Sequence, residues 1–132
     1  GQFEAALRVK PDFPEPRYNL ANTLAQNGRL AEAAPHYAAL LQVRPDDAEA
    51  RSNYSDVLLE LGRGPEAIAQ LEAAVRLKPA SAELHNNLGT ALARTGRPAE
   101  ARPHFQEALR LQPDFTGARE NLERVNRALR GG

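Results

Sequence analysis

A period of 34 residues runs through this chain and constrains its fold more than any other feature. Prolines recur at this interval, and glycine, asparagine and glutamate keep the same phase. The repeated positions are Pro11, Pro45, Pro79 and Pro113; Gly28, Gly62 and Gly96; Asn19, Asn53, Asn87 and Asn121; and Glu32, Glu66 and Glu100. Chance does not hold four residue types in phase in this way. A fixed period of this length indicates a stacked array of similar units, each contacting only its neighbours.

Each unit reads as two helices. In the first complete unit, apolar residues at helical spacing form one stripe from Tyr18 to Leu24 and a second from Leu30 to Leu41. Gly28 follows the first stripe and is predicted to be a left-handed C-cap. The Gly-Arg turn between the stripes is short, so the two helices must be antiparallel. The sequence therefore predicts an all-α fold built from antiparallel helix pairs.

The period also predicts how the chain is divided. We expect one domain over residues 1–132, with segment boundaries at 1–12, 13–46, 47–80, 81–114 and 115–130. The three middle segments are complete units, and the first resembles the second helix of a truncated unit, which predicts a fragment of a longer protein. The last segment is a charged helix with one narrow apolar face, formed by Leu122, Val125 and Leu129. Such a helix suits a cap on the end of a stack.

Composition excludes several classes of partner and chemistry. Lys plus Arg and Asp plus Glu each number 17, so the net charge is zero and gives no general attraction to nucleic acid or to an anionic membrane. There is no cysteine, which excludes disulfides, thiolate metal sites and thiol catalysis. No apolar run reaches the length of a membrane span, and no signal peptide is visible. These features leave the compartment open between cytoplasm and periplasm.

The third unit carries the most specific motif. It contains Leu88-Gly89, then Leu92, then Ala101 and Phe105 in an A-x3-F spacing, and finally Pro113. This order resembles the tetratricopeptide repeat, whose pattern is W-x2-L-G-x2-Y, then A-x3-F, then P. The other units follow it more loosely, and the tryptophan position holds Arg17, Arg51 and His85. The alanine- and arginine-rich character is similar to that of bacterial members of the family.

The resemblance implies a right-handed α-α superhelix, a solenoid whose first helices line a concave groove. By the same resemblance, the chain is expected to be a non-enzymatic module that binds an extended peptide or a partner helix in that groove. The residues expected to line it are Tyr18, Asn19, Asn22, Gln26, Ser52, Asn53, Asp56, Asn86, Asn87, Thr90, Arg94, Asn121 and Arg124.

The repeated asparagines are the sharpest functional hint in this groove. A side-chain amide both donates and accepts, so a ladder of them can hold a peptide backbone whatever its side chains. Such ladders line the groove of the O-linked N-acetylglucosamine transferase superhelix. The alternative is that each asparagine bonds a neighbouring helix. A clamp for a C-terminal carboxylate, known in some family members, is disfavoured because basic groups appear only at Arg94 and Arg124.

Gly89 stands in the interior of a predicted helix, where glycine costs roughly 1 kcal/mol relative to alanine. The equivalent residues are Ala21 and Ser55, which are also small. A small side chain lets two helices approach to about 8 Å. We therefore predict that Gly89 loses helix propensity in exchange for close packing within its unit.

No catalytic, metal-binding or cofactor-binding group can be argued from the spacing. The three histidines are His36, His85 and His104; the first and last are equivalent positions two units apart, and His85 is predicted to pack in place of the family tryptophan. Two further hypotheses remain open. The segment could be the substrate-recruiting arm of a larger enzyme such as a glycosyltransferase, or a scaffold that self-associates through an uncapped face at Phe3 and Leu7.

Overall fold

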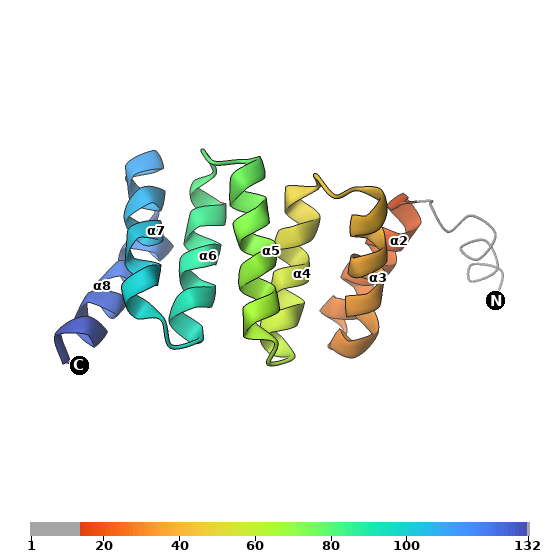
Figure 1. The fold of residues 1–132 in the computed structure, drawn as a ribbon, viewed down its shortest axis with the longest axis horizontal. Coiled ribbons are helices and arrows are strands. Elements are labelled where there is room, and N and C mark those ends of the chain that lie inside the picture. Colours follow the sequence, from red (N-terminus) through yellow and green to blue (C-terminus); the bar gives the residue numbers. More distant parts are fainter. Residues whose placement is uncertain (1–13, 132) are drawn as a thin grey trace.

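The computed structural model describes residues 14–131, and within them it contains seven α-helices and no strand. The helices are α2 (Pro14–Gln26), α3 (Leu30–Val43), α4 (Ala48–Glu60), α5 (Gly64–Leu77), α6 (Ala82–Arg94), α7 (Pro98–Leu111) and α8 (Thr116–Gly131). They stand in a row in chain order (Figure 1). The predicted all-α helical repeat is confirmed. Phe3 and Leu7, proposed for self-association, lie outside the described residues.

Packing in this row is local. The helices α2 and α3, α4 and α5, and α6 and α7 form the closest pairs, and each pair rests on the next through α3 with α4 and α5 with α6. The buried side chains therefore form a series of layers, and the largest of those with almost no exposed surface are Tyr37, Leu40, Leu58, Leu71 and Phe105. None of the described helices is both long and apolar enough to cross a lipid bilayer.

Helix α8 closes the described end of the row. It packs against α7 and α6, and Val125 is buried there with only 4% of its surface exposed. Leu122 and Leu129 are partly buried on the same apolar cluster. The narrow apolar face predicted for the terminal helix is thus the face that packs.

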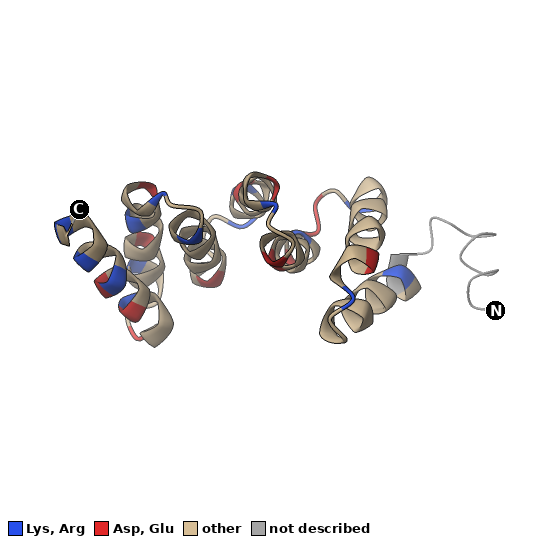
Figure 2. Cartoon of the chain, turned by 90° about the horizontal axis from the view of Figure 1, so that it is seen from below, with Lys and Arg blue, Asp and Glu red and all other residues tan. Residues whose placement is uncertain are grey.

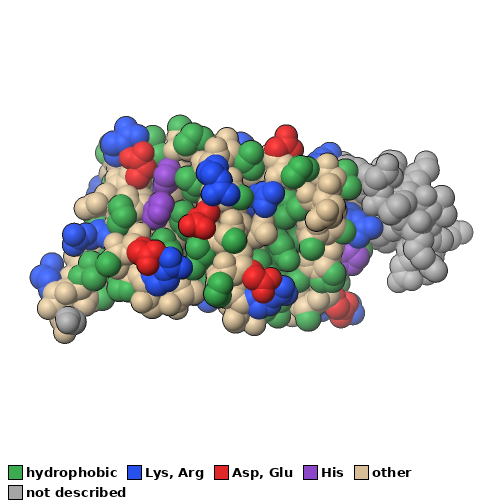
Figure 3. Space-filling model, in the orientation of Figure 1, with side chains coloured by type: hydrophobic (Ala, Val, Ile, Leu, Met, Phe, Trp, Pro, Cys, Tyr) green, Lys and Arg blue, Asp and Glu red, His purple; other side chains and the backbone are tan. Residues whose placement is uncertain are grey.

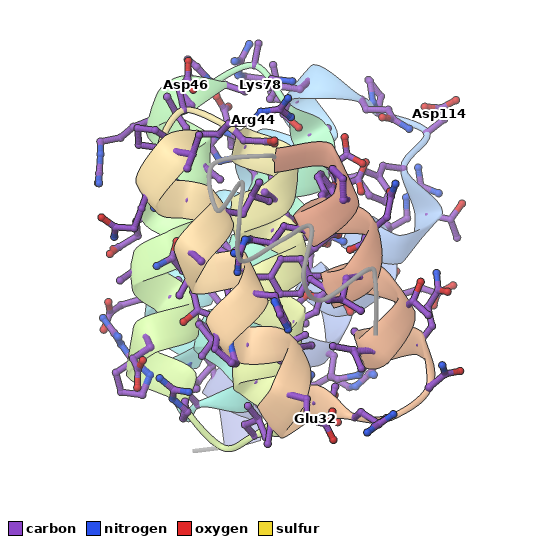
Figure 4. All side chains as sticks on the ribbon, turned by 90° about the vertical axis from the view of Figure 1, so that its right-hand side faces the viewer. Glu32, Arg44, Asp46, Lys78 and Asp114 are labelled. Atoms are coloured by element: carbon purple, nitrogen blue, oxygen red, sulfur yellow. The ribbon has the colours of Figure 1, made fainter. Side chains whose placement is uncertain are left out.

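The turn inside each unit has one repeated geometry. Gly28, Gly62 and Gly96 have φ values of +77°, +77° and +81°, the left-handed conformation that glycine adopts without steric cost. The arginine after each glycine donates its backbone N–H to the carbonyl five residues earlier, as Arg63 does to Leu58 at 2.8 Å. The predicted left-handed caps are therefore present. Figure 4 shows that these turns lie at one edge of the row, marked by Glu32, while Arg44, Asp46, Lys78 and Asp114 mark the loops between units at the opposite edge.

Gly89 on α6 packs directly against Phe105 on α7. A Cβ atom built on Gly89 would lie 2.7 Å from Cε1 of Phe105, far inside van der Waals contact. The equivalent residues Ala21 and Ser55 are both fully buried, and the position of Phe105 is held in their own units by Tyr37 and Leu71. The Phe105 ring thus leaves no room for a side chain at position 89, and the close packing predicted for Gly89 is present.

Candidate functional site

The first helices of successive units form the inner wall of the stack. In addition to their partners within each pair, α2, α4, α6 and α8 contact one another in turn, and the second helices make no comparably extensive contact among themselves. A row whose members are closer on one side curves toward that side. Charged residues of both signs are spread along the whole row (Figure 2). Because the row curves toward the first helices, the surface of α2, α4, α6 and α8 is the candidate groove.

The asparagine ladder bonds each of these helices to the preceding one. The Nδ2 atom of Asn53 donates to Tyr18 Oη at 2.9 Å, and that of Asn87 donates to Ser52 Oγ at 3.1 Å. The Nδ2 atom of Asn121 donates to Asn86 Oδ1 at 3.0 Å. One amide N–H of Asn53, Asn87 and Asn121 thus joins neighbouring units. This is the alternative to ligand binding that the sequence left open.

The side-chain carbonyl oxygens of the ladder accept fewer hydrogen bonds than its amide N–H groups donate. Asn121 Oδ1 accepts from Arg124 Nη1 at 3.0 Å. Across residues 14–131, no hydrogen bond to the Oδ1 atoms of Asn53 and Asn87 is formed. Two carbonyl oxygens, one on α4 and one on α6, are therefore available to accept a hydrogen bond from a ligand. The first asparagine of the ladder, Asn19, is exposed on α2.

Three hollows follow this wall, one between each pair of neighbouring first helices. The α2–α4 hollow has a volume of about 380 Å³, the α4–α6 hollow about 390 Å³ and the α6–α8 hollow about 370 Å³. Their lining includes most of the side chains predicted for the groove, namely Asn22, Gln26, Ser52, Asn53, Asp56, Thr90, Arg94, Asn121 and Arg124. The predicted residues Tyr18, Asn86 and Asn87 lie in the hydrogen-bonded ladder between the hollows.

Burial is the main cause of the pKa shifts of Asp56, Tyr18 and Tyr37 on and beside the wall. Burial raises the pKa of the Asp56 carboxyl, as do the neighbouring charges of Glu60 and Glu83, while Arg94 opposes them. Arg94 also pairs with Glu60, with Nη2 3.3 Å from Oε1. The pKa of Tyr37 rises to about 12, chiefly through burial, and its hydroxyl donates to Asn22 Oδ1. Tyr18 also has a raised pKa, from burial first and then from Glu49. These tyrosines are neutral packing groups that fix the amides beside them.

A histidine pair lies on another face and was missed by the sequence reasoning. His85 on α6 and His104 on α7 are close, with ring centroids 5.7 Å apart and the two Nδ1 atoms 3.5 Å apart. Two histidines are visible side by side in Figure 3. The Nε2 atom of His85 donates to the Pro79 carbonyl at 2.9 Å, because a carbonyl can only accept. His85 therefore ties α6 both to α7 and to the loop before it.

A repeated spacing could have revealed this pair. Residues 19 apart also meet in the other units: Arg17 reaches His36, and Arg51 donates to Gln70 Oε1 at 2.8 Å. The tryptophan position thus faces the second helix of its own unit. In the described part of the chain, no three histidine, aspartate or glutamate side chains gather as metal ligands.

The histidine pair should make stability depend on pH. Burial lowers the pKa of His104, and the neighbouring His85 lowers it further, while Glu72 opposes them. A histidine whose pKa is lower in the folded chain gives stability that is present above its unfolded pKa, near 6.5, and is lost as the pH falls below that value. We expect urea unfolding to show a smaller loss between pH 7.5 and pH 5.5 in His104→Gln than in the wild type. An equal loss in both would contradict this role for His104.

The comparisons with known proteins agree with this architecture. A sequence profile described as tetratricopeptide repeat matches residues 1–48, 18–82 and 55–115. No curated protein matches the chain at a significant level. Among solved structures, the first tetratricopeptide domain of Spaghetti (RPAP3), bound to an HSP90 peptide, is 20% identical with a TM-score of 0.81, over 86% of this chain and 90% of that one.

Two further structures are similar. MamA is 18% identical with a TM-score of 0.89, over 96% of this chain and 74% of that one. YrrB, described as a tetratricopeptide protein with an unusual peptide-binding site, is 26% identical with a TM-score of 0.78, over 95% of this chain and 64% of that one.

Proposed function

The chain belongs to the tetratricopeptide repeat family, and we propose that it binds an extended peptide along the wall formed by α2, α4, α6 and α8. Tetratricopeptide repeats are in general modules for protein interaction rather than catalysts. The observation that carries the proposal is the pair of carbonyl acceptors at Asn53 and Asn87, which lie along the same wall as the three hollows. The similar structures bound to an HSP90 peptide and described by a peptide-binding site lend support.

The ladder suits a peptide main chain. The amide N–H groups of Asn53 and Asn87 are held by the preceding helix, which fixes the direction of their carbonyl oxygens. A fixed acceptor loses little freedom when a ligand N–H binds to it. The hollows between the first helices then provide space for side chains of the ligand. Recognition of this kind gives affinity through the backbone and selectivity through the pockets.

The polar middle of the wall favours an extended peptide over a partner helix. An amphipathic helix binds by laying an apolar face into an apolar groove, and its own backbone groups are already paired. Here the α4–α6 hollow is lined by Glu49, Ser52, Asn53, Lys78 and Glu83 among others, so its surface is mainly polar. Polar side chains of this kind have more to gain from unpaired peptide groups than from a helix.

The proposal predicts that the ladder matters for affinity. In the double variant Asn53→Ala/Asn87→Ala, two hydrogen bonds to the peptide are lost. Each is worth about 0.5–1.5 kcal/mol net, so affinity should fall by roughly 5- to 150-fold. An array of extended peptides would supply the ligand, and fluorescence anisotropy would measure its binding.

Ser52→Ala is the matched control. It removes the hydrogen bond from Asn87 to the preceding helix but keeps both asparagine carbonyls and the bond from Asn53 to Tyr18. If the ladder acts on the peptide, this variant should bind much more tightly than the double alanine variant. If the two bind alike, or if the double variant binds as well as wild type, the asparagines serve only to join the units.

A further inference from the structure

Two positions of the wall recur once in every unit, and the charge of the residue at each position differs from one unit to the next. The first holds Asn22, Asp56, Thr90 and Arg124, and the second holds Gln26, Glu60, Arg94 and Ala128, at intervals of 34 residues. The scaffold around each position is the same. At these two positions the side chains are neutral on α2 and acidic on α4, and each of α6 and α8 carries one arginine.

The charge of the side chains that line the hollows changes in the same direction along the wall. Asp56 and Glu60 line the α2–α4 hollow, whereas Arg94 and Arg124 line the α6–α8 hollow. Across the α4–α6 interval, Glu60 and Arg94 pair with each other at 3.3 Å. Two hollows of similar volume thus stand at opposite ends of the wall with opposite charge.

The α6–α8 hollow has both arginine side chains and an apolar floor. Phe105, Val125, Ala93 and Ala128 line it, and Phe105 and Val125 belong to the buried cluster beneath. Arg124 bonds the neutral oxygen of Asn121 at 3.0 Å, and within residues 14–131 it forms no ion pair with a carboxylate. The pair of Arg94 with Glu60 is exposed, with 49% and 57% of the two side chains accessible, and exposed pairs exchange partners at little cost.

We propose that the α6–α8 hollow takes a large apolar side chain of the bound peptide, with an acidic residue beside it held by Arg124 and Arg94. This inference rests on the proposed function and states which chemistry the ligand presents at one end of the wall. Guanidinium groups bind carboxylates through paired hydrogen bonds, and the apolar floor excludes water from the neighbouring side chain. The acidic α2–α4 hollow repels the same segment, so the position of the ligand is determined by charge.

The experiment uses two peptides whose ends are both blocked, so that no terminal carboxylate contributes. One carries leucine flanked by glutamates in a serine and asparagine background, and the other carries glutamine in place of each glutamate. We expect the wild type to bind the glutamate peptide about tenfold more tightly in fluorescence anisotropy, and added salt to reduce this preference. Methyl resonances of Val125 and Ala128 should shift on binding.

Arg124→Glu should abolish the preference for the glutamate peptide. Arg102→Glu is the matched control because it makes the same change in net charge at an exposed position of α7 that does not line the hollow. The proposal is overturned if Arg102→Glu reduces the preference as much as Arg124→Glu does, because the effect is then one of net charge alone.

Equal binding of both peptides by the wild type would also overturn the assignment of this hollow, while leaving the proposed function intact. The same holds if neither peptide binds but the array finds others that depend on Asn53 and Asn87. The proposed function itself fails separately, when no peptide in the array depends on those two asparagines.

Discussion

Replacing Phe105 by alanine is expected to lower the free energy of unfolding by about 3–5 kcal/mol. Phe105 is 1% exposed and belongs to a buried cluster with Leu71, Leu88 and Leu92. The substitution removes apolar contacts and leaves a cavity, because neighbouring helices relax only in part. Urea unfolding followed by circular dichroism would measure the loss.

The location of this loss can also be tested. In a stack, each unit contacts only its neighbours, so the damage should be greatest in α6, α7 and α8. Hydrogen exchange should accelerate there more than in α3. Val43→Ala is the control, since Val43 is 45% exposed and its truncation should change stability by less than about 0.5 kcal/mol. A loss from Phe105→Ala as small as that of the control would show that the α6–α7 layer is not packed as described.

The second large effect concerns Gly89, where alanine is expected to destabilise the protein although it is the better helix former. Helix propensity alone predicts a gain of about 1 kcal/mol, whereas overpacking costs about 1–3 kcal/mol. The added Cβ would meet the Phe105 ring at 2.7 Å, and ring atoms fixed in a core cannot move away cheaply. The difference is a net loss of up to about 2 kcal/mol in urea unfolding.

A double variant separates the two contributions. The second unit pairs Ser55 with the smaller Leu71 at the equivalent positions, so Phe105→Leu should make room for a methyl group at position 89. In the Phe105→Leu background, Gly89→Ala should therefore become neutral or stabilising. If alanine at position 89 stabilises the wild-type background as well, close packing against Phe105 is not the reason for the glycine.

Much of the fold can be read from the sequence because a repeated stack is determined by local relations. The period of 34 predicts the units, and the helical stripes predict which faces are buried. Gly28, Gly62 and Gly96 indicate the turns because only glycine adopts a positive φ without strain. The sequence predicts that Gly89 permits close packing, because the equivalent residues Ala21 and Ser55 are also small.

The groove was predicted only as a set of positions. The resemblance placed the expected residues on the first helices, and the structure brings many of them to the three hollows. The sequence left open whether the asparagines bond a neighbouring helix or a ligand. In the structure their N–H groups bond the preceding helix, and within residues 14–131 the carbonyl oxygens of Asn53 and Asn87 accept no hydrogen bond.

The sequence by itself determined the repeating unit, the turns and the burial pattern, because these depend on residues close together in the chain or in phase with one another. Only the tertiary structure decided that His85 meets His104, that Asn87 donates to Ser52 and that Arg94 pairs with Glu60. Each of these contacts joins two different helices. Its geometry depends on how far apart the helices lie and how each side chain turns, and a period along the chain specifies neither.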